Sequence, residues 1–401
     1  MMRRKSVFAL TILGLALAGT PVSTKADVNV NVKNSVNASA LIDPSEYRRT
    51  LDDLTKTVPL TYNEPVKRMI NYYASSHKAK FSKVLGLSQY YFPIYERVFK
   101  ERGVPEEIKY LSIVESSLNP FALSSAQAGG LWQFLEPVGK IYGLQINETI
   151  DERRDPVLAC NAAASYLLDS YEMYKDWLLA IASYNCGRNN IRWAMEKAPS
   201  ATTYWELRQY LPAETQSYVP AFIATVYLMN NSKRHGIFPV KPDFNISTRE
   251  ISVNRPVSLY SVAKAVGVEA SELIVLNAAY KNQIVNGSIE KPRKLVIPVI
   301  KDYLHNALCD ALRQSGKLED ELHLVYTIPV ETKVASVVPK KASNSANYKA
   351  VDTYVKYKVK EGDTLSSIVE QFNSTEAEVK VLNRLKQASV KPGMILTIIQ
   401  G

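Results

Sequence analysis

An internal repeat in the C-terminal third restricts the possible folds of this chain more than any other feature. The segment LYSVAKAVGVEASELIVLN (259–277) aligns without gaps with LSSIVEQFNSTEAEVKVLN (365–383), and both carry apolar residues at helical spacing before ending on Leu-Asn. Each copy is followed by a proline, Pro292 or Pro392, and then by a short apolar run typical of a strand. The repeat therefore predicts two similar small units rather than one continuous domain.

Each unit is expected to contain a strand, two helices and a second strand. Ahead of the second copy, YVKYKVKEGDT alternates like a strand and ends on Asp363 and Thr364, either of which can cap a helix. The apolar face of that helix would consist of Leu365, Ile368, Val369 and Phe372. Residues 334–350 are polar and lack periodicity, which predicts a flexible linker between the two units.

The second copy resembles the LysM domain, a module that binds glycans containing N-acetylglucosamine, such as peptidoglycan and chitin. The resemblance is carried by YKVKEGDTLSSIVEQF, the following Leu-Asn and VKPGMILTI, which together cover the module from end to end. The first copy departs from this pattern at residues 255–258, where Arg-Pro-Val-Ser replaces Glu-Gly-Asp-Thr, and it has six extra residues before its proline. The same fold is expected for both copies, whereas glycan binding by the first copy is left open.

The chain from about Val58 to Met229 is predicted to be helical throughout. Apolar residues recur there at helical spacing, and several segments carry helix boundary signals. DPVLACNAAASYLLDSYEMY (155–174) opens with a capping aspartate and a first-turn proline, and YYFPIYERVFKERG (90–103) ends on a glycine. These features indicate an all-α domain.

One acid in this helical part occupies an apolar setting. Glu115 belongs to VESSLNPFALSSAQAGGLWQF (114–134), behind a helix start predicted at Pro105. At about 100° per residue, its helical face is shared with Ile108, Leu111 and Leu118. A different, polar sector of the same helix would carry Lys109, Ser112 and Ser116. A carboxyl in this position is either paired with a cation or kept protonated for chemistry, and the pattern alone leaves both open.

Residues from about 59 to 230 resemble the lytic transglycosylases of the lysozyme superfamily, most closely the membrane-bound lytic murein transglycosylase D family. The motifs, in the family's order, are ESSLNPFALSSAQAGGLWQF, DERRDP (151–156), ASYNCG (182–187) and ETQSYVP (214–220). Many family members have Gly and Ala where this chain has Gln127 and Gly129. The resemblance implies that Glu115 is the catalytic acid and base. It also implies that the sugar cleft around Glu115 is lined by Ser124, Gln133, Tyr184, Asn185 and Tyr218. Tyr218 is expected to form a hydrogen bond with Glu115.

The expected reaction needs only one acid. Most glycosidases use two carboxylates, but Glu106, Glu107 and Glu136, the acids near Glu115 in sequence, lack a comparable apolar context. The resemblance implies that the 6-hydroxyl of the sugar acts as the nucleophile, which gives a 1,6-anhydromuramic product without water. A muramidase-type hydrolase of the same glycan and a non-catalytic peptidoglycan-binding scaffold are the alternatives. DERRDP is interpreted as a structural loop that caps the next helix.

The N-terminus predicts export. Three basic residues precede an apolar run from about Val7 to Ala18, and cleavage after Ala26 fits the small residues that follow. Cleavage after Ala18 and a retained membrane anchor are the alternatives. The net charge of +10 suits an anionic polymer outside the cytoplasm, but no basic stripe with interleaved aromatic residues indicates nucleic acid. Whether Cys160 and Cys186 form a disulfide is left open.

The expected fold class is a mainly α lysozyme-like catalytic domain followed by two small βααβ modules of the LysM type. The expected divisions are a signal peptide (1–26), a leader segment (27–58), the transglycosylase domain (59–245), a divergent LysM-like module (248–300), a connecting helix and flexible linker (301–352) and a LysM domain (353–401). No metal site and no cofactor are predicted. The expected partner is peptidoglycan in the periplasm, and peripheral association with the outer membrane is left open.

Overall fold

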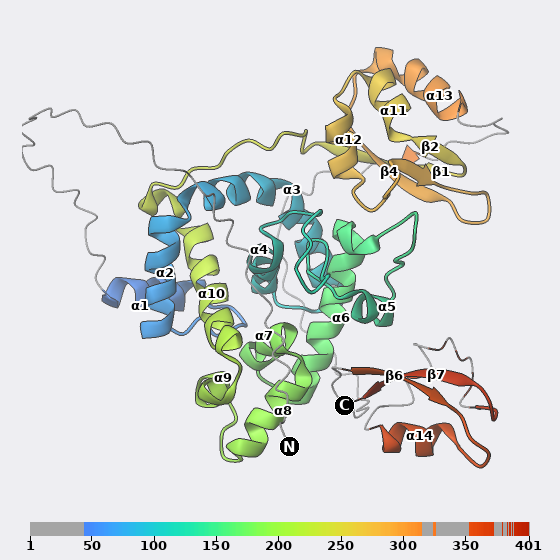
Figure 1. The fold of residues 1–401 in the computed structure, drawn as a ribbon. Coiled ribbons are helices and arrows are strands. Elements are labelled where there is room, and N and C mark those ends of the chain that lie inside the picture. The colour runs from blue at the N-terminus through green and yellow to red at the C-terminus, as the bar shows by residue number, and fades with distance from the viewer. Residues whose placement is uncertain are drawn as a thin grey trace, which may run out of the picture.

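The structure is a computed structural model that describes residues 44–314, 324–325, 353–372 and 389–400, together with Val379, Asn383, Leu385 and Gln387. A large helical domain is followed by two small modules of strands and helices (Figure 1). The predicted signal peptide, the start of the leader and most of the linker lie outside the described residues. No helix in the described part of the chain is both long enough and apolar enough to cross a bilayer.

The mainly α class predicted for the first part of the chain is confirmed. Its α-helices are α1 (Pro44–Leu54), α2 (Glu64–Ser76), α3 (Lys78–Arg102), α4 (Leu111–Ser116), α5 (Glu136–Ile141), α6 (Pro156–Tyr174), α7 (Trp177–Cys186), α8 (Arg188–Lys197), α9 (Tyr204–Leu207) and α10 (Ala213–Asn230). Short 3₁₀ turns accompany them at η1 (Glu106–Tyr110), η2 (Glu152–Arg154), η3 (Arg208–Tyr210) and η4 (Ser232–His235).

The helical domain is built around α10, whose residues from Tyr218 to Leu228 are all buried. This helix packs against α2, α4 and α7, while α6 packs against α3 and α7 (Figure 1). The helix ends follow the local signals in the sequence. Asp155 accepts hydrogen bonds from the first backbone amides of α6, and Gly103 ends α3 in the left-handed conformation that glycine allows.

The folded part begins earlier than predicted. Residues 44–54, expected in the leader, form α1, which packs against α10. Tyr47 and Leu51, one helical turn apart, are 5% and 0% exposed, and the ring of Tyr47 stacks on Tyr62. Sequence analysis missed this helix because its apolar residues are few and stand in an otherwise polar segment.

The helix predicted from Pro105 is also different in detail. The chain forms the 3₁₀ turn η1 first and continues directly into the short helix α4. The polar sector expected at Lys109, Ser112 and Ser116 is buried, with these side chains at most 9% exposed. It remains satisfied because Lys109 forms ion pairs with Glu96 and Glu106 and because both serines donate hydrogen bonds to a backbone carbonyl.

The first module contains β1 (Thr248–Val253), β2 (Pro256–Ser258), α11 (Leu259–Val266), α12 (Ala270–Leu276), β3 (Ile284–Asn286), β4 (Arg293–Pro298), η5 (Asp302–Leu304) and α13 (His305–Gln314). Strands β1 and β4 are antiparallel, and β5 (Leu324–Val325) pairs with the other edge of β1. The strand β3 lies within the stretch lengthened by the extra residues and pairs with β2. Ser258 caps α11 in place of the missing Asp-Thr pair.

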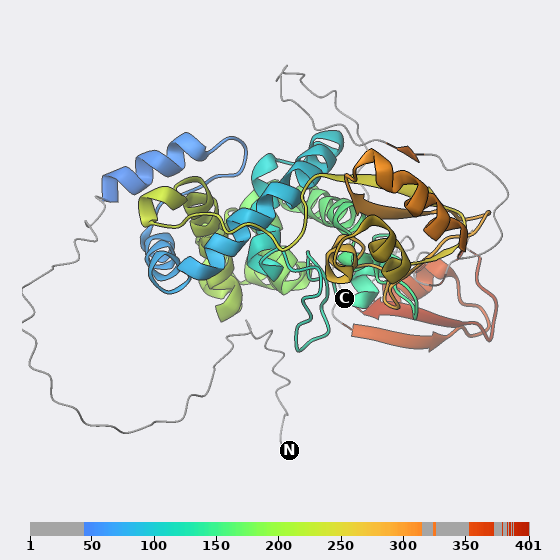
Figure 2. The ribbon, with the colours of Figure 1, turned by 90° about the horizontal axis from the view of Figure 1, so that it is seen from above.

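The helix α13 belongs to the first module, contrary to the prediction of a connecting helix within residues 301–352. It packs against α11, and its residues Leu308 and Leu312 are 2% and 3% exposed. We therefore define the first module as residues 248–314. In both views this module lies against one side of the helical domain (Figures 1 and 2).

The second module (353–400) has its own small core. Strands β6 (Thr353–Lys358) and β7 (Ile395–Gln400) are antiparallel, and α14 (Leu365–Gln371) lies between them in sequence. Thr364 caps α14 in a capping box with Ser367, whereas Asp363 accepts hydrogen bonds from Tyr357 and from the amide of Lys360. As predicted, Leu365 and Ile368 are buried, with Val369 and Phe372 packed against them. The second predicted helix falls mostly outside the described residues.

Candidate active site

The carboxyl of Glu115 lies where α4 meets α10. Glu115 is the penultimate residue of α4, and its Oε1 accepts a hydrogen bond from the hydroxyl of Tyr218 on α10. The side chain is half-buried. The groups in the described structure that affect this carboxyl are Tyr218 and a second carboxylate, Glu214. The interpretation of Glu115 as one half of an ion pair therefore has no support in this geometry.

The surroundings of Glu115 favour the protonated acid. Burial of the carboxyl raises the pKa of Glu115 to about 8; the hydrogen bond from Tyr218 lowers it and the negative charge of Glu214 raises it further. Burial, together with the charge of Glu115, holds the pKa of Tyr218 well above its usual range, so the phenol keeps its proton and acts as the donor. At neutral pH the site thus holds a proton on a carboxyl that is only partly exposed.

The segment that follows α4 returns to the same helix as a glycine turn (residues 122–134). Ser112 and Ser116 both donate hydrogen bonds to the carbonyl of Leu131, at 2.9 and 2.8 Å, which fixes the turn beside α4. Within the turn, the amide of Gly130 donates to the carbonyl of Ala122. The turn is thus attached both to itself and to the helix that carries Glu115.

Several residues on this part of the backbone have left-handed conformations. They are Ser117, Leu118, Gln127, Gly130 and Gln133. A positive φ is unfavourable for residues with a side chain, and such strain is often found at functional sites. Gln127 has a φ of 65°. Many of the lytic transglycosylases that this chain resembles have glycine at this position, and glycine tolerates such a conformation without strain.

Two predicted site residues lie in the glycine turn itself. Ser124 is half-buried and closes a small loop, because its hydroxyl accepts a hydrogen bond from the amide of Ala128 at 3.0 Å. The side-chain nitrogen Nε2 of Gln133 donates to the backbone carbonyls of Gly130 and Ala122, at 2.9 and 3.2 Å. Trp132 and Phe134, which flank Gln133, are 0% and 3% exposed and belong to the core.

Tyr184 and Asn185, near the end of α7, connect the glycine turn to the start of α10. The hydroxyl of Tyr184 donates to the carbonyl of Trp132 at 2.8 Å. The side chain of Asn185 donates to Glu214 at 3.3 Å and accepts from the hydroxyl of Thr215 at 2.7 Å. The structure therefore links Tyr184 to the glycine turn and Asn185 to the acid that lies nearest to Glu115 on α10.

Glu214 is the site residue that sequence reasoning missed. It precedes Tyr218 by four positions in α10 and so lies on the same helical face. Burial raises the pKa of Glu214, and the hydrogen bond from Asn185 opposes this. The motif ETQSYVP contained the information needed to predict Glu214. An acid one helical turn before Tyr218, a tyrosine expected at the site, projects from the same face of the helix.

The other acids considered near Glu115 have structural partners. Glu107, 4% exposed, accepts hydrogen bonds from the amides of Lys56 and Thr57 at 2.9 and 2.7 Å. Glu106 forms an ion pair with Lys109, and Glu136 forms one with Lys140 on the surface. DERRDP is likewise structural, as interpreted, because Asp155 caps α6 and the side chain of Arg153 is buried. Cys160, Cys186 and Cys309 form no disulfide.

Comparisons with known proteins give three family matches along the chain. Residues 93–205 match the transglycosylase SLT domain, residues 247–311 match the LysM-like domain of lytic transglycosylase MltD, and residues 357–398 match the LysM domain. Membrane-bound lytic murein transglycosylase D of Escherichia coli is 32% identical over 306 residues, which is 75% of this chain. The chain spans 62% of the length of that relative.

Among solved structures, the chain is similar to an inactive mutant of the lytic transglycosylase Slt from Pseudomonas aeruginosa, with a TM-score of 0.31 and 21% identity over 38% of this chain and 25% of that one. It is also similar to the 70 kDa soluble lytic transglycosylase of Escherichia coli, with a TM-score of 0.33 and 17% identity over 49% of this chain and 34% of that one.

The family matches agree with the motifs found in the sequence. The SLT match spans Glu115, the glycine turn and α7, and the two LysM matches fall on the two copies of the repeat. The chain therefore contains a transglycosylase SLT domain, followed by a LysM-like domain of the lytic transglycosylase MltD type and a LysM domain.

Proposed function

We propose that the protein is a peptidoglycan lytic transglycosylase. It cleaves the β-1,4 bond between N-acetylmuramic acid and N-acetylglucosamine and leaves a 1,6-anhydromuramic end. The observation that carries this proposal is the Glu115 carboxyl, which burial keeps protonated at neutral pH and which accepts a hydrogen bond from Tyr218, within a domain of the SLT family. The curated relative bears the name of a lytic murein transglycosylase, which agrees with this reaction.

In the proposed mechanism Glu115 acts twice. As an acid it gives its proton to the bridging glycosidic oxygen while the bond from that oxygen to the muramic C1 breaks. The resulting carboxylate, stabilised by the hydroxyl of Tyr218, then takes the proton of the muramic 6-hydroxyl as its oxygen bonds to C1. Glu115 ends the cycle protonated, and no water is consumed.

The remaining predicted residues would bind the sugar around this acid. Ser124 and Gln133 belong to the glycine turn, which brings backbone and amide groups to one side of α4. Tyr184 and Asn185 approach from α7 and are attached to the turn and to Glu214, respectively. We assign these four residues to substrate binding, because none of their side chains can give up or take up a proton near neutral pH.

Glu214 favours a second candidate, a hydrolase of the same glycan. An inverting glycosidase needs a second carboxylate that activates water, and Glu214 is the acid whose charge affects Glu115. The hydrogen bond from Asn185 occupies one oxygen of Glu214 and opposes the rise in its pKa, which weakens this carboxylate as a base and favours the transglycosylase. The products separate the two, because a hydrolase leaves reducing ends and a transglycosylase leaves anhydro ends.

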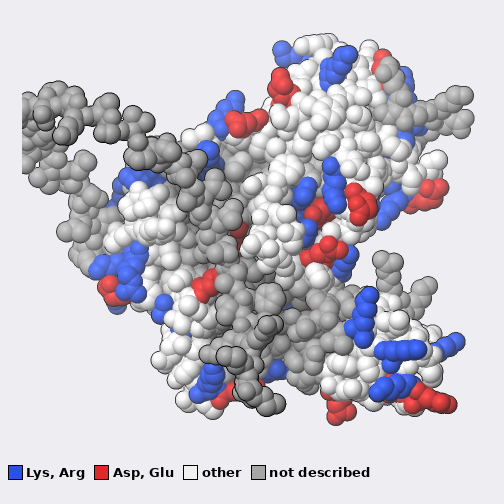
Figure 3. Space-filling model, in the orientation of Figure 1, with Lys and Arg blue, Asp and Glu red and all other residues white. Residues whose placement is uncertain are grey.

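The LysM modules and the charge support a partner in the cell envelope. Basic side chains of the second module are visible on the face shown in Figure 3. The exposed lysines of this module include Lys356, Lys358, Lys360 and Lys391. They suit the carboxylates of peptidoglycan. We propose that this module binds peptidoglycan, that the protein acts in the periplasm after export, and that any association with the outer membrane is peripheral.

Mass analysis of the products from purified peptidoglycan tests the proposal. We expect anhydromuramic ends from the parent protein, and we expect Glu115→Gln to lower turnover by on the order of 10²–10⁴-fold, because the amide cannot donate a proton. Glu136→Gln, which changes an exposed acid paired with Lys140, is the matched control and should retain activity. Reducing ends would favour the hydrolase, and no release at all would favour a binding scaffold.

A further inference from the structure

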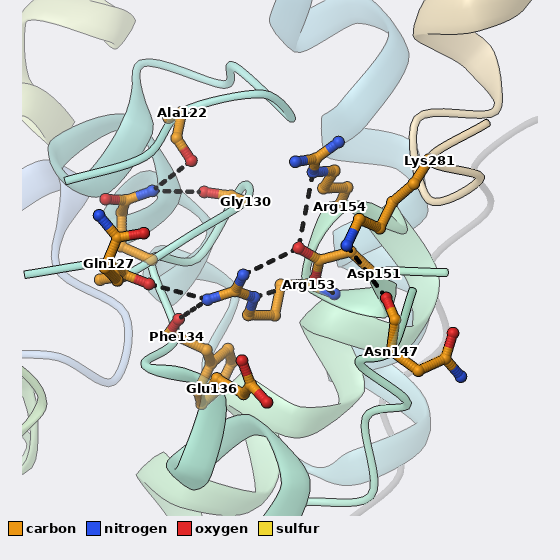
Figure 4. Close-up of polar contacts among 12 residues, drawn as sticks. Ala122, Gln127, Gly130, Phe134, Glu136, Asn147, Asp151, Arg153, Arg154 and Lys281 are labelled. Carbon is orange, nitrogen blue, oxygen red and sulfur yellow. Dashed lines mark hydrogen bonds and ion pairs between the residues drawn. The ribbon is translucent and has the colours of Figure 1, made fainter. Parts of the chain in front are cut away.

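The first module is fixed to the helical domain through the loop that follows α5. The amide of Asp151 donates to the carbonyl of Ala279 at 2.8 Å, and the amide of Lys281 donates to the carbonyl of Thr149 at 3.0 Å. The ammonium of Lys281 also reaches the carbonyl of Asn147 at 3.1 Å (Figure 4). Backbone pairing of this kind gives one defined position of the module on residues 145–153.

Charged side chains complete the same contact. Arg293 of β4 donates to Glu152 at 3.1 Å and to the side chain of Gln145 at 2.9 Å. The Glu152 side chain is 5% exposed, and its other oxygen accepts from the amide of Gln145 at 2.7 Å. A buried carboxylate needs such a partner, so removing the guanidinium would leave Glu152 without its cation.

Three of the module residues in this contact come from the part of the first copy that departs from the LysM pattern, and Arg293 follows directly after the proline. Ala279, Lys281 and Lys291 all lie between the Leu-Asn that ends the repeat and its proline, where this copy has its extra residues. Lys291 donates to Gln145 at 3.0 Å. The lengthened segment is therefore used to contact the helical domain.

The loop held by the module in turn holds the glycine turn. The guanidinium of Arg153 is fixed by Asp151 at 2.8 and 2.9 Å, and it donates to the carbonyls of Gln127 and Phe134 at 2.9 and 3.0 Å (Figure 4). The fit is close, because a Cβ added at Gly130 would lie 1.9 Å from the carbonyl oxygen of Arg153. Displacement of the loop must therefore displace the turn.

We propose that the first module is a clamp that positions the substrate-binding turn, with Arg293 as its positioning residue, rather than a second glycan-binding module. The proposal rests on the proposed function for its activity readout. The clamp runs from Arg293 through Glu152 and Arg153 to the carbonyls of Gln127 and Phe134 in the glycine turn. Glu115 and Tyr218 lie on α4 and α10 and make no part of it.

The test uses the full chain with Arg293→Ala and the matched control Lys294→Ala. Lys294 is the next residue of β4, but it is 68% exposed and forms its ion pair with Glu250 inside the module. We expect Arg293→Ala to lower kcat/KM on soluble glycan fragments on the order of tenfold, chiefly through KM, because a displaced turn binds sugar less well. The alkaline limb of the pH profile of kcat/KM, which reports the loss of the Glu115 proton, should stay at the same pH. For Lys294→Ala, kcat/KM should stay within about twofold of the parent value.

Hydrogen exchange gives a readout that needs no activity. The amides of Ser124, Gly129 and Gly130 donate hydrogen bonds within the glycine turn, and we expect them to exchange faster in Arg293→Ala and unchanged in Lys294→Ala. Arg293→Lys keeps a cation for Glu152 and should give intermediate effects, which covers the case in which Arg293→Ala unfolds the module.

Full activity of Arg293→Ala with unchanged exchange in residues 122–134 would overturn the clamp. So would equal effects of Arg293→Ala and Lys294→Ala. Failure of the proposed function is recognised separately, because Glu115→Gln would then keep full turnover, and in that case the exchange of the turn alone decides whether the clamp exists.

Discussion

Glu115→Gln should make the protein more stable at neutral pH although it removes the proposed acid. The pKa of Glu115 is about 8 in the folded protein, against an ordinary value of 4.5. Between these values the folded protein holds a proton that the unfolded chain has released. The stability contributed by the carboxyl is therefore complete below pH 4.5, falls as the pH rises, and is lost above about pH 8. Glutamine does not titrate and avoids this loss.

The size of the effect follows from the same two values. Each pH unit between them costs about 1.4 kcal/mol, so the parent protein loses at most about 3 kcal/mol through Glu115 between pH 4.5 and pH 7. The side chain is half-buried and the amide has its own desolvation cost, so we expect a gain of about 1–2 kcal/mol at pH 7. That corresponds to a rise in Tm of roughly 2–8 °C for a domain of this size.

Urea denaturation of the full chain at several pH values between 4.5 and 8 measures this. The stability difference between Glu115→Gln and the parent should be close to zero or slightly negative at pH 4.5, where only the desolvation cost of the amide remains, and should grow steadily toward pH 8. Glu136→Gln, at an exposed acid, should stay within about 0.5 kcal/mol of the parent at every pH. A Glu115→Gln protein that is less stable at pH 7, or a difference that does not depend on pH, would refute a buried protonated carboxyl.

Further expectations concern the neighbours of Glu115 and the second module. In pH–rate profiles, Glu214→Gln should move the alkaline limb to lower pH, because it removes the negative charge that raises the pKa of Glu115. Tyr218→Phe should move this limb to higher pH, because it removes the hydrogen bond that lowers the same pKa. Shifts in the opposite directions would contradict the site geometry. The isolated second module, which has a core of its own, should be retained on insoluble peptidoglycan. A Glu115→Gln chain that ends at residue 314, and so lacks this module, should be retained more weakly. Equal retention of the two would refute this ranking. Deleting residues 334–401 should lower activity on intact sacculi but change activity on short soluble fragments by less than about twofold, because the second module only raises the local concentration of the enzyme at the wall; loss of activity on soluble fragments would contradict this tether.

Local signals in the sequence predicted those features that depend on neighbouring residues. The helical spacing between Val58 and Met229 predicted the all-α domain. Asp155 predicted the start of α6, and the pair Asp363 and Thr364 predicted that of α14, where Thr364 is the residue that caps the helix. The repeat predicted the two modules. Glu115 could be singled out because an acid at apolar helical spacing is unusual within a single helix.

Tertiary structure decided which residues distant in sequence meet. Ser112 and Ser116 were assigned only to a polar sector of the helix, but they are buried because the carbonyl of Leu131 returns to them. The extra residues of the first LysM-like copy indicated no partner in the sequence, yet Lys291 among them contacts Gln145, and Arg293 beside them meets Glu152, 141 positions earlier in the chain. Glu214 lies in a motif that was recognised, but its influence on Glu115 depends on how α10 packs against α4. Helical periodicity encodes partners three or four residues apart, whereas these pairs are set by the packing of whole elements, which no local pattern contains.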